Sequence, residues 1–286
     1  MRLLYEDRVE ERAVAVMDLR TQTGDTARAF DGVAGEYHDT NMANPILLEM
    51  RTRALATLRR HVAAGAEVLD IGCGPGTDHP ALLDAGYVVT AIDASPEMVR
   101  QAQRRAAAVG GPHRPTVLCR PVNELRSFAP RQFDAAFSNF GPLNCSPAPF
   151  DAACQIHDVL RPGGLLVASV IGRFCPWEVA LYLARGQAGR AFLRFRRGPV
   201  GVPLKDGTVW TRYISPGACA RIFTAAGFSV RHVRALGITA PPPYLEAFAL
   251  RRPALVRRLF ALDDVIGTWP VVRAAGDHFL IVLQRD

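Results

Sequence analysis

Runs of apolar residues alternate with helix-like patterns over residues 66–171. Short apolar runs bounded by turn residues are typical of buried strands, and apolar positions three or four apart mark one face of a helix. The runs predict strands at 66–72, 87–93, 115–120, 133–140 and 165–172. The patterns between them predict helices at 77–86, 95–110 and 149–160. Strands that alternate with helices indicate an α/β protein with a parallel sheet.

The rhythm changes after residue 173. The segment 176–198 has the pattern of a basic amphipathic helix, and 202–214 predicts two extended arms around a turn at Asp206-Gly207. The sheet pattern then resumes with a helix at 215–227 and strands at 228–238 and 277–285. A proline-led helical stretch at 241–270 separates those two strands. We therefore expect one core with additions.

Composition narrows the class of protein. A hydrophobic fraction of 49% with 21% charged residues is ordinary for a globular protein, and no run of about 18 uncharged apolar residues predicts a membrane span. The first twenty residues mix charges into the apolar positions, unlike a secretory signal, so we expect a cytoplasmic protein. The six cysteines are scattered and show no metal-ligand spacing, which predicts reduced thiols and no metal site.

The net charge of +7 raises the question of an anionic partner. The arginines are spread along the chain and no recognition module for RNA is visible, so we expect a solvated basic surface and no nucleic-acid partner. Nothing in the pattern indicates an oligomeric state.

The stretch "VLDIGCGPGTD" at 68–78 carries the clearest candidate chemistry. A dinucleotide site needs G-x-G-x-x-G, but here the third position is Thr77 and the third glycine comes one residue early, at Gly76. The strand also contains Asp70, whose carboxylate would repel a diphosphate and suit a ligand with an ammonium or sulfonium group. This argues against a nicotinamide cofactor.

Taken together, Asp70, Gly72, Gly74 and Gly76 resemble the glycine-rich motif of the class I S-adenosylmethionine-dependent methyltransferases. Three further stretches match that family in order and spacing: "AIDAS" after the second strand, "FDAAFSNFGPLN" at 133–144 and "LRPGGLLVAS" at 160–169. The resemblance implies a Rossmann-like, doubly wound α/β fold whose seven-stranded sheet has the order 3-2-1-4-5-7-6, with strand seven antiparallel. It also implies S-adenosylmethionine as the cofactor.

On this basis we divide the chain into four parts. They are an N-terminal helical cap or lid (1–45), a cofactor-binding core (46–172), an inserted region expected to cap the substrate (173–214), and the C-terminal part of the core (215–286) with its helical insertion at 241–270. The insertions thus follow strands five and six.

The resemblance also implies which residues hold the cofactor. Asp93 corresponds to the acid that accepts hydrogen bonds from the ribose hydroxyls. The full set of predicted cofactor contacts is Tyr37, Asp70, Gly72, Cys73, Gly74, Pro75, Gly76, Asp93, Ala94, Met98, Asn123, Glu124, Asn139 and Phe140. The family often places an acid after strand three for the adenine amino group, but this chain has Arg120 and Pro121 there. Asn123, Glu124 or a backbone carbonyl is left for that contact.

The methyl acceptor is predicted only as a class. Methyl transfer needs positioning and water exclusion, and a base only where the acceptor carries a proton. His38 is the candidate base, although a surface histidine in a polar turn explains it equally well. Candidate substrate contacts are Leu143, Asn144, Trp177, Trp210 and Tyr213, and an ordinary satellite core explains the aromatic ones equally well. We expect a small apolar or aromatic metabolite.

Alternatives from other classes stay open. The segment 244–260 is apolar on one side and carries arginines elsewhere, as in an interfacial helix, so a lipid-like acceptor at a membrane surface is one alternative. A core-facing helix with solvated arginines is the other explanation of that segment. A non-catalytic cofactor-binding or scaffolding domain is the remaining alternative, and the presence of both Asp70 and Asp93 argues against it.

Overall fold

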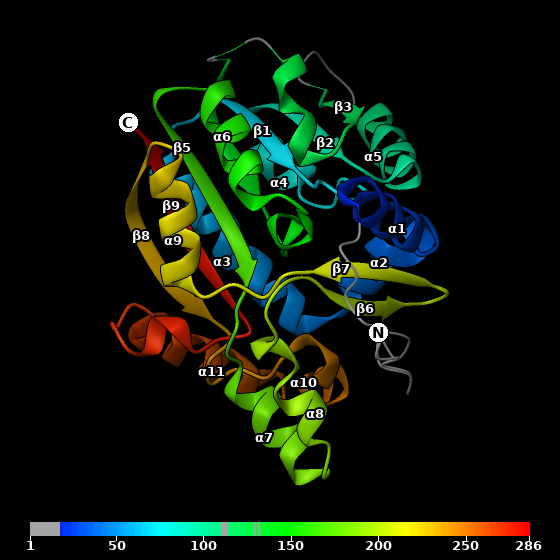
Figure 1. Cartoon of the computed structure of the whole chain (residues 1–286), viewed down its shortest axis with the longest axis vertical. Coiled ribbons are helices and arrows are strands. Elements are labelled where there is room, and N and C mark those ends of the chain that lie inside the picture. Colours follow the sequence, from blue (N-terminus) through cyan, green and yellow to red (C-terminus); the bar gives the residue numbers. More distant parts are fainter. Residues whose placement is uncertain (1–17, 110–113, 129, 131) are drawn as a thin grey trace.

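The computed structural model describes residues 18–109, 114–128, 130 and 132–286. The first part of the predicted cap, residues 1–17, lies outside them. Figure 1 shows a central twisted sheet with helices on both of its faces and a separate group of helices beyond one end of it. Within the described ranges, no helix combines the length and the apolar character needed to cross a membrane.

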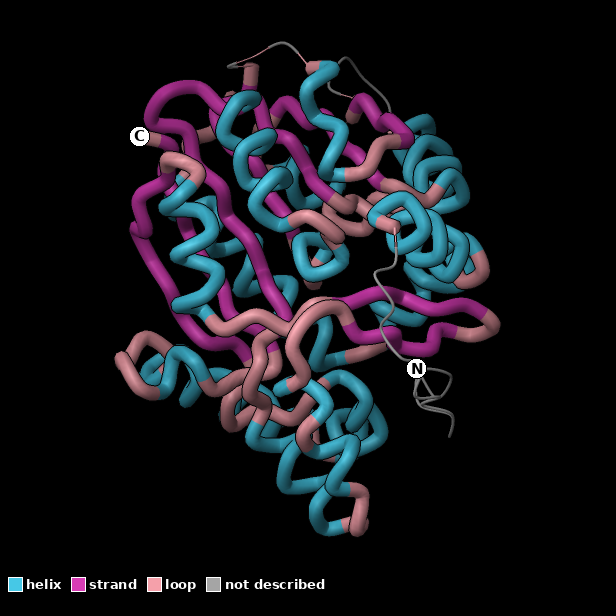
Figure 2. The backbone as a smooth tube through the Cα atoms, in the orientation of Figure 1, coloured by secondary structure: helices cyan, strands magenta, loops and turns pink. Residues whose placement is uncertain are grey.

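The central sheet has seven strands in the order β3-β2-β1-β4-β5-β9-β8. These strands are β1 Glu67–Ile71, β2 Val88–Asp93, β3 Thr116–Cys119, β4 Phe133–Ser138, β5 Leu160–Ile171, β8 Phe228–Leu236 and β9 His278–Arg285. Strands β1 to β5 pair in parallel, whereas β9 runs antiparallel to both β5 and β8. Because β6 and β7 form a separate hairpin, β8 and β9 are the sixth and seventh strands of the sheet along the chain, and the predicted order 3-2-1-4-5-7-6 is confirmed. Figure 2 shows the hairpin, in magenta, apart from the strands of the central sheet.

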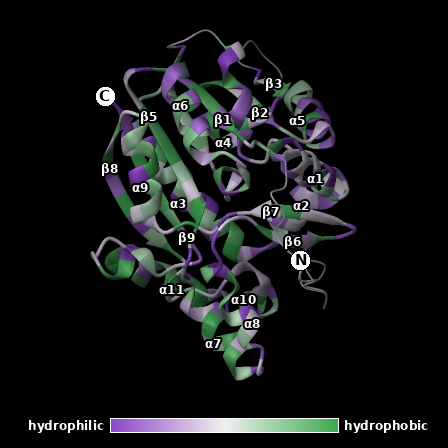
Figure 3. Cartoon of the chain, viewed as in Figure 1, coloured by the Kyte–Doolittle hydropathy of each residue, from purple (hydrophilic) through white to green (hydrophobic). Residues whose placement is uncertain are grey.

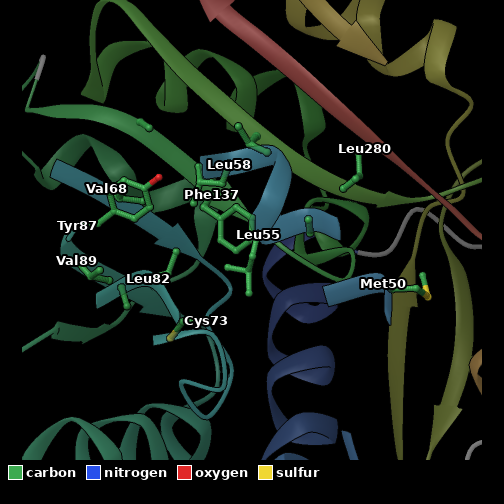
Figure 4. Close-up of a cluster of buried hydrophobic side chains, with 14 of the residues drawn as sticks. Met50, Leu55, Leu58, Val68, Cys73, Leu82, Tyr87, Val89, Phe137 and Leu280 are labelled. Carbon is green, nitrogen blue, oxygen red and sulfur yellow. The ribbon is translucent and has the colours of Figure 1, made fainter. Parts of the chain in front are cut away.

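Two apolar layers sandwich the sheet, because successive strand residues point to opposite faces. Val68 and Phe137 pack on one face against α3 Pro45–His61, α4 His79–Asp84 and α5 Pro96–Ala108. Figure 4 shows this cluster around Phe137, with Leu55 and Leu58 of α3. Leu69 and Ala136 pack on the other face, against α6 Pro149–Val159 and α9 Pro216–Ala225. Both faces are covered, as a parallel sheet requires.

The sheet topology places a ligand site at one edge. The carboxyl ends of β1, β2 and β4 lie side by side, since these strands are parallel neighbours. The chain moves from β1 to β2 in one direction and later returns to β4 on the other side of β1, so the strand order reverses between β1 and β4. Ligands in such sheets bind outside the carboxyl ends at this switch point.

The additions lie at the same edge. The cap consists of α1 Leu19–Asp31 and α2 Ala34–Ala43, and the insertion after β5 consists of α7 Pro176–Ala184, α8 Ala188–Ala191, the turn η4 Leu193–Phe195, and the hairpin of β6 Val200–Leu204 and β7 Gly207–Thr211. The insertion after β8 contains the turn η5 Pro243–Leu245, α10 Glu246–Arg251 and α11 Pro253–Ile266.

Two predictions about the insertion after β5 were wrong in detail. The single helix expected at 176–198 is broken, because Gly186 adopts a left-handed φ of 69° between α7 and α8. The hairpin turns at Lys205-Asp206 instead of Asp206-Gly207, and Lys205 takes the positive φ of 52°. A Cβ on Gly207 would lie 2.7 Å from Ala29, so this glycine serves the close approach of β7 to α1.

Candidate functional site

A pocket lies at the switch point and encloses about 1020 Å³ of space, including its mouth toward solvent. Eleven of the predicted cofactor residues line it: Tyr37, Gly72, Cys73, Gly74, Pro75, Asp93, Ala94, Met98, Asn123, Asn139 and Phe140. The lining also includes residues that were not predicted, among them Thr23, Thr26, Ala27, Phe30, Arg51, Thr77, Asp78, Ser95, Arg120, Val122, Cys145, Ser146 and Pro147.

The glycine turn forms one wall of the pocket. Gly72, Gly74 and Gly76 all have positive φ, of 71°, 54° and 78°. A Cβ on Gly72 would lie 2.3 Å from the side chain of Pro142, so that position requires glycine for packing. A Cβ on Gly74 would meet no atom within 4 Å, and Gly74 lines the pocket. The backbone at Gly74 is therefore open to a ligand.

Asp93 is fixed beside this turn at the end of β2. Its carboxylate accepts hydrogen bonds from the backbone amides of Gly74 and Ser95, each at 2.9 Å. Burial raises the pKa of the Asp93 carboxyl to about 6, although both amides oppose that change. A carboxylate so held is an oriented acceptor for a pair of hydroxyl groups.

Asp70 and Gly76 do not line the pocket, contrary to the prediction. The side chain of Asp70 is buried beneath the turn, 3.4 Å from Nε2 of His79, and burial raises its pKa. A Cβ on Gly76 would lie 2.7 Å from Nδ1 of His79, so this glycine allows the turn to pack on that ring. Strand alternation explains the correction for Asp70, since its neighbour Ile71 faces the pocket instead.

A charged cluster from α3 and the segment after β1 lines the pocket. Its acid is Asp78, whose carboxylate lies in the pocket wall, where Asp70 was expected. Arg51 forms an ion pair with Asp78, and its guanidinium lies 4.8 Å from the ring centre of Phe140. The amide nitrogen of Asn139 donates to Asp78 at 3.2 Å. The amide oxygen of Asn139 is buried and has no hydrogen-bond partner among the described residues. The cluster thus offers a cation, an anion and an unsatisfied acceptor to a ligand.

The region after β3 is where the resembled family often places an acid for the adenine amino group. This chain has Arg120 and Pro121 there. The guanidinium of Arg120 lies 4.9 Å from the ring centre of Phe128. Asn123 lines the pocket, but its amide already donates to the carbonyl of Ala148 and accepts from the hydroxyl of Ser146. Glu124 is exposed and lies outside the pocket lining. The wall here is mostly apolar, from Ala94, Met98, Pro121, Val122 and Pro147.

The helical cap, formed by α1 and α2, covers one side of the pocket. Phe30 of α1 and Tyr37 of α2 line it, with their rings edge to face at 6.1 Å. Asp31 at the end of α1 accepts from the hydroxyl of Ser95 at 2.6 Å and from the amide of Glu97 at 2.9 Å. These bonds attach the cap to the first turn of α5, beside the pocket wall.

His38, the candidate base, does not line the pocket. Its Nδ1 lies 3.1 Å from the hydroxyl of Thr77, which does line it. Burial and the nearby charge of Arg105 lower the pKa of His38, so the ring is neutral at pH 7. The structure thus gives His38 a suitable charge state but not a position within the pocket.

None of the five predicted substrate residues lines the pocket. Asn144 is buried and bridges two segments, because its amide donates to the carbonyls of Ile171 and Arg212 and accepts from the amide of Ile171. The indole of Trp210 donates to Asp25 of the cap at 3.0 Å. Their side chains thus serve the fold, which corrects the predicted contacts.

The other three have structural partners as well. Leu143 belongs to the apolar core beside α6 and α9. The indole of Trp177 donates to the carbonyl of Thr239 at 3.0 Å, and the ring of Tyr213 lies 5.3 Å from the guanidinium of Arg194. The three aromatic residues thus have polar or charged partners within the fold, and none of them belongs to an apolar cluster of the described residues.

Comparison with known proteins identifies the domain that carries this pocket. Residues 68–164 match the sequence model of a family described as methyltransferase domain. A demethylmenaquinone methyltransferase of Tropheryma whipplei is 32% identical over 145 residues, which cover 51% of this chain and 58% of that protein. A malonyl-[acyl-carrier protein] O-methyltransferase of Enterobacter lignolyticus is 33% identical over 147 residues, covering 51% and 53%. The chain thus spans little more than half the length of these curated relatives.

The fold is shared over nearly the whole chain. A 1,6-didemethyltoxoflavin-N1-methyltransferase of Burkholderia thailandensis, solved with its substrate and S-adenosylhomocysteine, superposes with a TM-score of 0.59 at 18% identity and 98% coverage of both chains. The sheet order, the glycine turn and the family match agree with the resemblance seen in the sequence. Residues 68–164 accordingly match the methyltransferase domain family, on a fold that the chain shares with a solved methyltransferase.

Proposed function

We propose that this protein transfers a methyl group from S-adenosylmethionine to a small apolar or aromatic molecule. The observation that carries the proposal is that one pocket holds both a fixed carboxylate, Asp93, and an open backbone position, Gly74, at the carboxyl edge of the sheet. The carboxylate suits the two ribose hydroxyls, and the glycine lets the ligand approach the chain.

We assign the amino-acid end of the cofactor to the charged cluster. Its carboxylate is a partner for Arg51, and its ammonium group is a partner for the unsatisfied amide oxygen of Asn139 and for the nearby carboxylate of Asp78. Each contact pairs a buried polar group with a group of opposite character, which offsets the cost of burying it. The apolar wall formed by Met98, Val122 and Pro147 suits an adenine ring.

The bound cofactor supplies an electrophilic methyl group on its sulfonium. The task of the protein is then to hold the acceptor in line and to exclude water. The cap residues Phe30 and Tyr37 close the pocket with aromatic surface. Burial raises the pKa of the Tyr37 hydroxyl, so it is neutral at pH 7 and suits hydrogen bonding better than proton abstraction. Because no histidine lines the pocket within the described ranges, the arrangement favours an acceptor that needs no base from the protein.

The relatives leave the acceptor open. Two of them carry the names of enzymes for demethylmenaquinone and for malonyl-[acyl-carrier protein], two unlike acceptors. The methyltransferase domain thus does not determine the acceptor, and the apolar cap is our basis for an apolar or aromatic one. We place the reaction in the cytoplasm, because all six cysteines are free.

The cofactor assignment is tested by Arg51→Gln. We expect this variant to bind S-adenosylhomocysteine at least tenfold more weakly, because one charge-assisted contact to the carboxylate is lost. Binding of 5′-methylthioadenosine, which has no amino-acid end, should change little. Equal losses for both ligands in calorimetric titration would contradict the assignment of Arg51 to the carboxylate.

The acceptor class is tested with labelled cofactor and fractionated cell extract. We expect label to enter material that organic solvent extracts and that nuclease does not remove. Label in a nuclease-sensitive macromolecular fraction would overturn the small-molecule assignment.

A further inference from the structure

The two helical insertions meet at the lower end of the molecule in Figure 1 and form what we call the peripheral lobe, residues 173–198 and 243–262. The indole of Trp177 on α7 donates to the carbonyl of Thr239, just before the second insertion. Burial raises the pKa of Tyr244 of η5, and Glu178 and Tyr182 of α7 lie near enough to raise it further, so the two insertions are neighbours. The lobe begins beyond the carboxyl end of β5 and therefore lies at the same edge of the sheet as the pocket.

The lobe exposes large apolar side chains. Phe192 and Phe195 are 50% and 41% exposed, and their ring centres lie 6.0 Å apart. Phe174 extends the cluster, 6.1 Å from Phe195, and Leu183 of α7 is also exposed. Figure 3 shows α7 coloured largely as hydrophobic.

The second insertion adds Phe248, Leu250 and Leu255, of which Leu250 is 59% exposed. Such clustering marks an interaction surface.

The exposed charge of the lobe is mostly positive, because its two acids are the buried Glu178 and the half-buried Glu246. No acidic residue occurs between Glu178 and Asp206, and Glu178 itself is buried. None occurs between Glu246 and Asp263. The exposed arginines in these stretches are Arg185, Arg196, Arg197, Arg251, Arg252, Arg257 and Arg258. The partner of this surface must therefore accept apolar groups and offer negative charge.

A buried ion-pair network fixes the turn that carries the exposed side chains of Phe192 and Phe195. Arg194, between the two exposed phenylalanines in sequence, donates to Glu178 at 2.9 Å and to Asp277 at 2.7 Å. Its guanidinium also donates to the carbonyl of Gly172 at 3.1 Å. Glu178, Asp277 and Cys175 have potential ligand atoms within 4.8 Å of one another, but both carboxylates are already ion-paired with the guanidinium of Arg194. The turn that carries Phe192 and Phe195 is thus fixed to the fold through Arg194.

We propose that the peripheral lobe docks this protein on the surface of an anionic lipid bilayer. Phenylalanine and leucine side chains would enter the interface, while the arginines contact lipid phosphates, which is the composition of an interfacial membrane anchor. Charge argues against a second copy as the occupant, because two such surfaces would bring many arginines together with only Glu246 from each copy between them. The exposed leucines Leu183 and Leu250 offer no stacking surface to nucleic-acid bases, whereas the phenylalanines do, so RNA binding is an outcome of the test below. The proposal does not depend on methyl transfer, and it places the pocket edge toward the membrane.

The test is cosedimentation of the full chain with vesicles of phosphatidylcholine, with or without phosphatidylglycerol. We expect binding to the anionic vesicles, much weaker binding to the neutral ones, and release by added salt. The double variant Phe192→Ser/Phe195→Ser should lower the partition coefficient on anionic vesicles at least tenfold. Its matched control is Phe150→Ser, which removes a phenylalanine 53% exposed on α6 and should bind as the wild type does.

A charge variant provides an independent arm if the phenylalanine variant fails to fold. Arg185→Glu/Arg197→Glu should lose binding to anionic vesicles, whereas Arg104→Glu/Arg221→Glu, with the same change in net charge on α5 and α9, should keep most of it. Failure of the wild-type chain to bind anionic vesicles would overturn the proposal. So would equal losses in the lobe variants and their controls, or binding to RNA or to a second copy through the phenylalanines in place of lipid. A chain that binds vesicles but no S-adenosylhomocysteine would contradict the proposed function alone.

Discussion

The carboxylate of Asp93 accepts a hydrogen bond from the backbone amide of Gly74 at 2.9 Å. This bond joins the end of β2 to the glycine turn that follows β1, nineteen residues earlier. The acid and the open backbone position are thus held together before any ligand arrives. Such preorganisation lowers the cost of ordering the site on binding.

The affinity for the cofactor should depend on pH through Asp93. Its pKa is raised to about 6 in the ligand-free protein, and only the ionised form accepts bonds from both ribose hydroxyls. Affinity for S-adenosylhomocysteine should therefore be constant above pH 7 and fall by up to about tenfold per pH unit below 6. Calorimetric titrations between pH 5 and 8, with circular dichroism to verify the fold, measure this. A constant affinity across that range would show that Asp93 does not hold the ribose.

Gly74→Val should abolish cofactor binding, because a branched side chain would occupy the pocket beside the backbone and strain a φ of 54°. Gly65→Val is the matched control. Gly65 also has a positive φ, of 84°, and open space around its Cβ, but it lies outside the pocket. Both variants should lose similar thermal stability, and Gly65→Val alone should keep its affinity. Full binding by Gly74→Val would remove the glycine turn from the site.

His38→Ala should reduce kcat by less than about tenfold, since a general base contributes about 10²–10⁴ and His38 does not line the pocket. Glu36→Ala, an exposed position on the same helix, serves as the control. The rates are measured with the acceptor once it is known. A loss of about 10³ with unchanged cofactor affinity would restore His38 as the base.

Asn144→Ala should lower the free energy of unfolding by about 2–4 kcal/mol, because it leaves three backbone groups of Ile171 and Arg212 without their partner. Urea denaturation of the variant and the wild type gives this difference. Unchanged stability together with a raised KM for the acceptor would instead support the original prediction that Asn144 contacts the substrate.

The strands of the sheet were predictable because strands buried on both faces appear as apolar runs, as in "VLDI" at 68–71. The glycine turn was predictable because its conformation needs glycine at fixed positions, and Asp93 follows from its place after the second strand. These signals are local in the sequence, so one chain is enough to see them.

Arg51, Asp78 and the cap residue Phe30 gave no such signal. They enter the pocket through tertiary packing, of α3 against the segment after β1 and of α1 against α5 and β7, and nothing in their neighbouring residues reveals those contacts. The aromatic residues of the insertion were predicted to contact the substrate, but none of them lines the pocket, for a related reason. A tryptophan such as Trp210 satisfies its indole within the fold as readily as in a binding site, here on Asp25.

The central claim is that the pocket at the glycine turn binds S-adenosylmethionine through Asp93. Isothermal titration of the folded wild-type chain with S-adenosylhomocysteine tests it most directly, in parallel with Asp93→Ala. We expect one site per chain, and an affinity weaker by about 1–3 kcal/mol in the variant, with an unchanged circular dichroism spectrum. Absence of binding to the folded wild-type chain, or equal affinity in the two proteins, would contradict it.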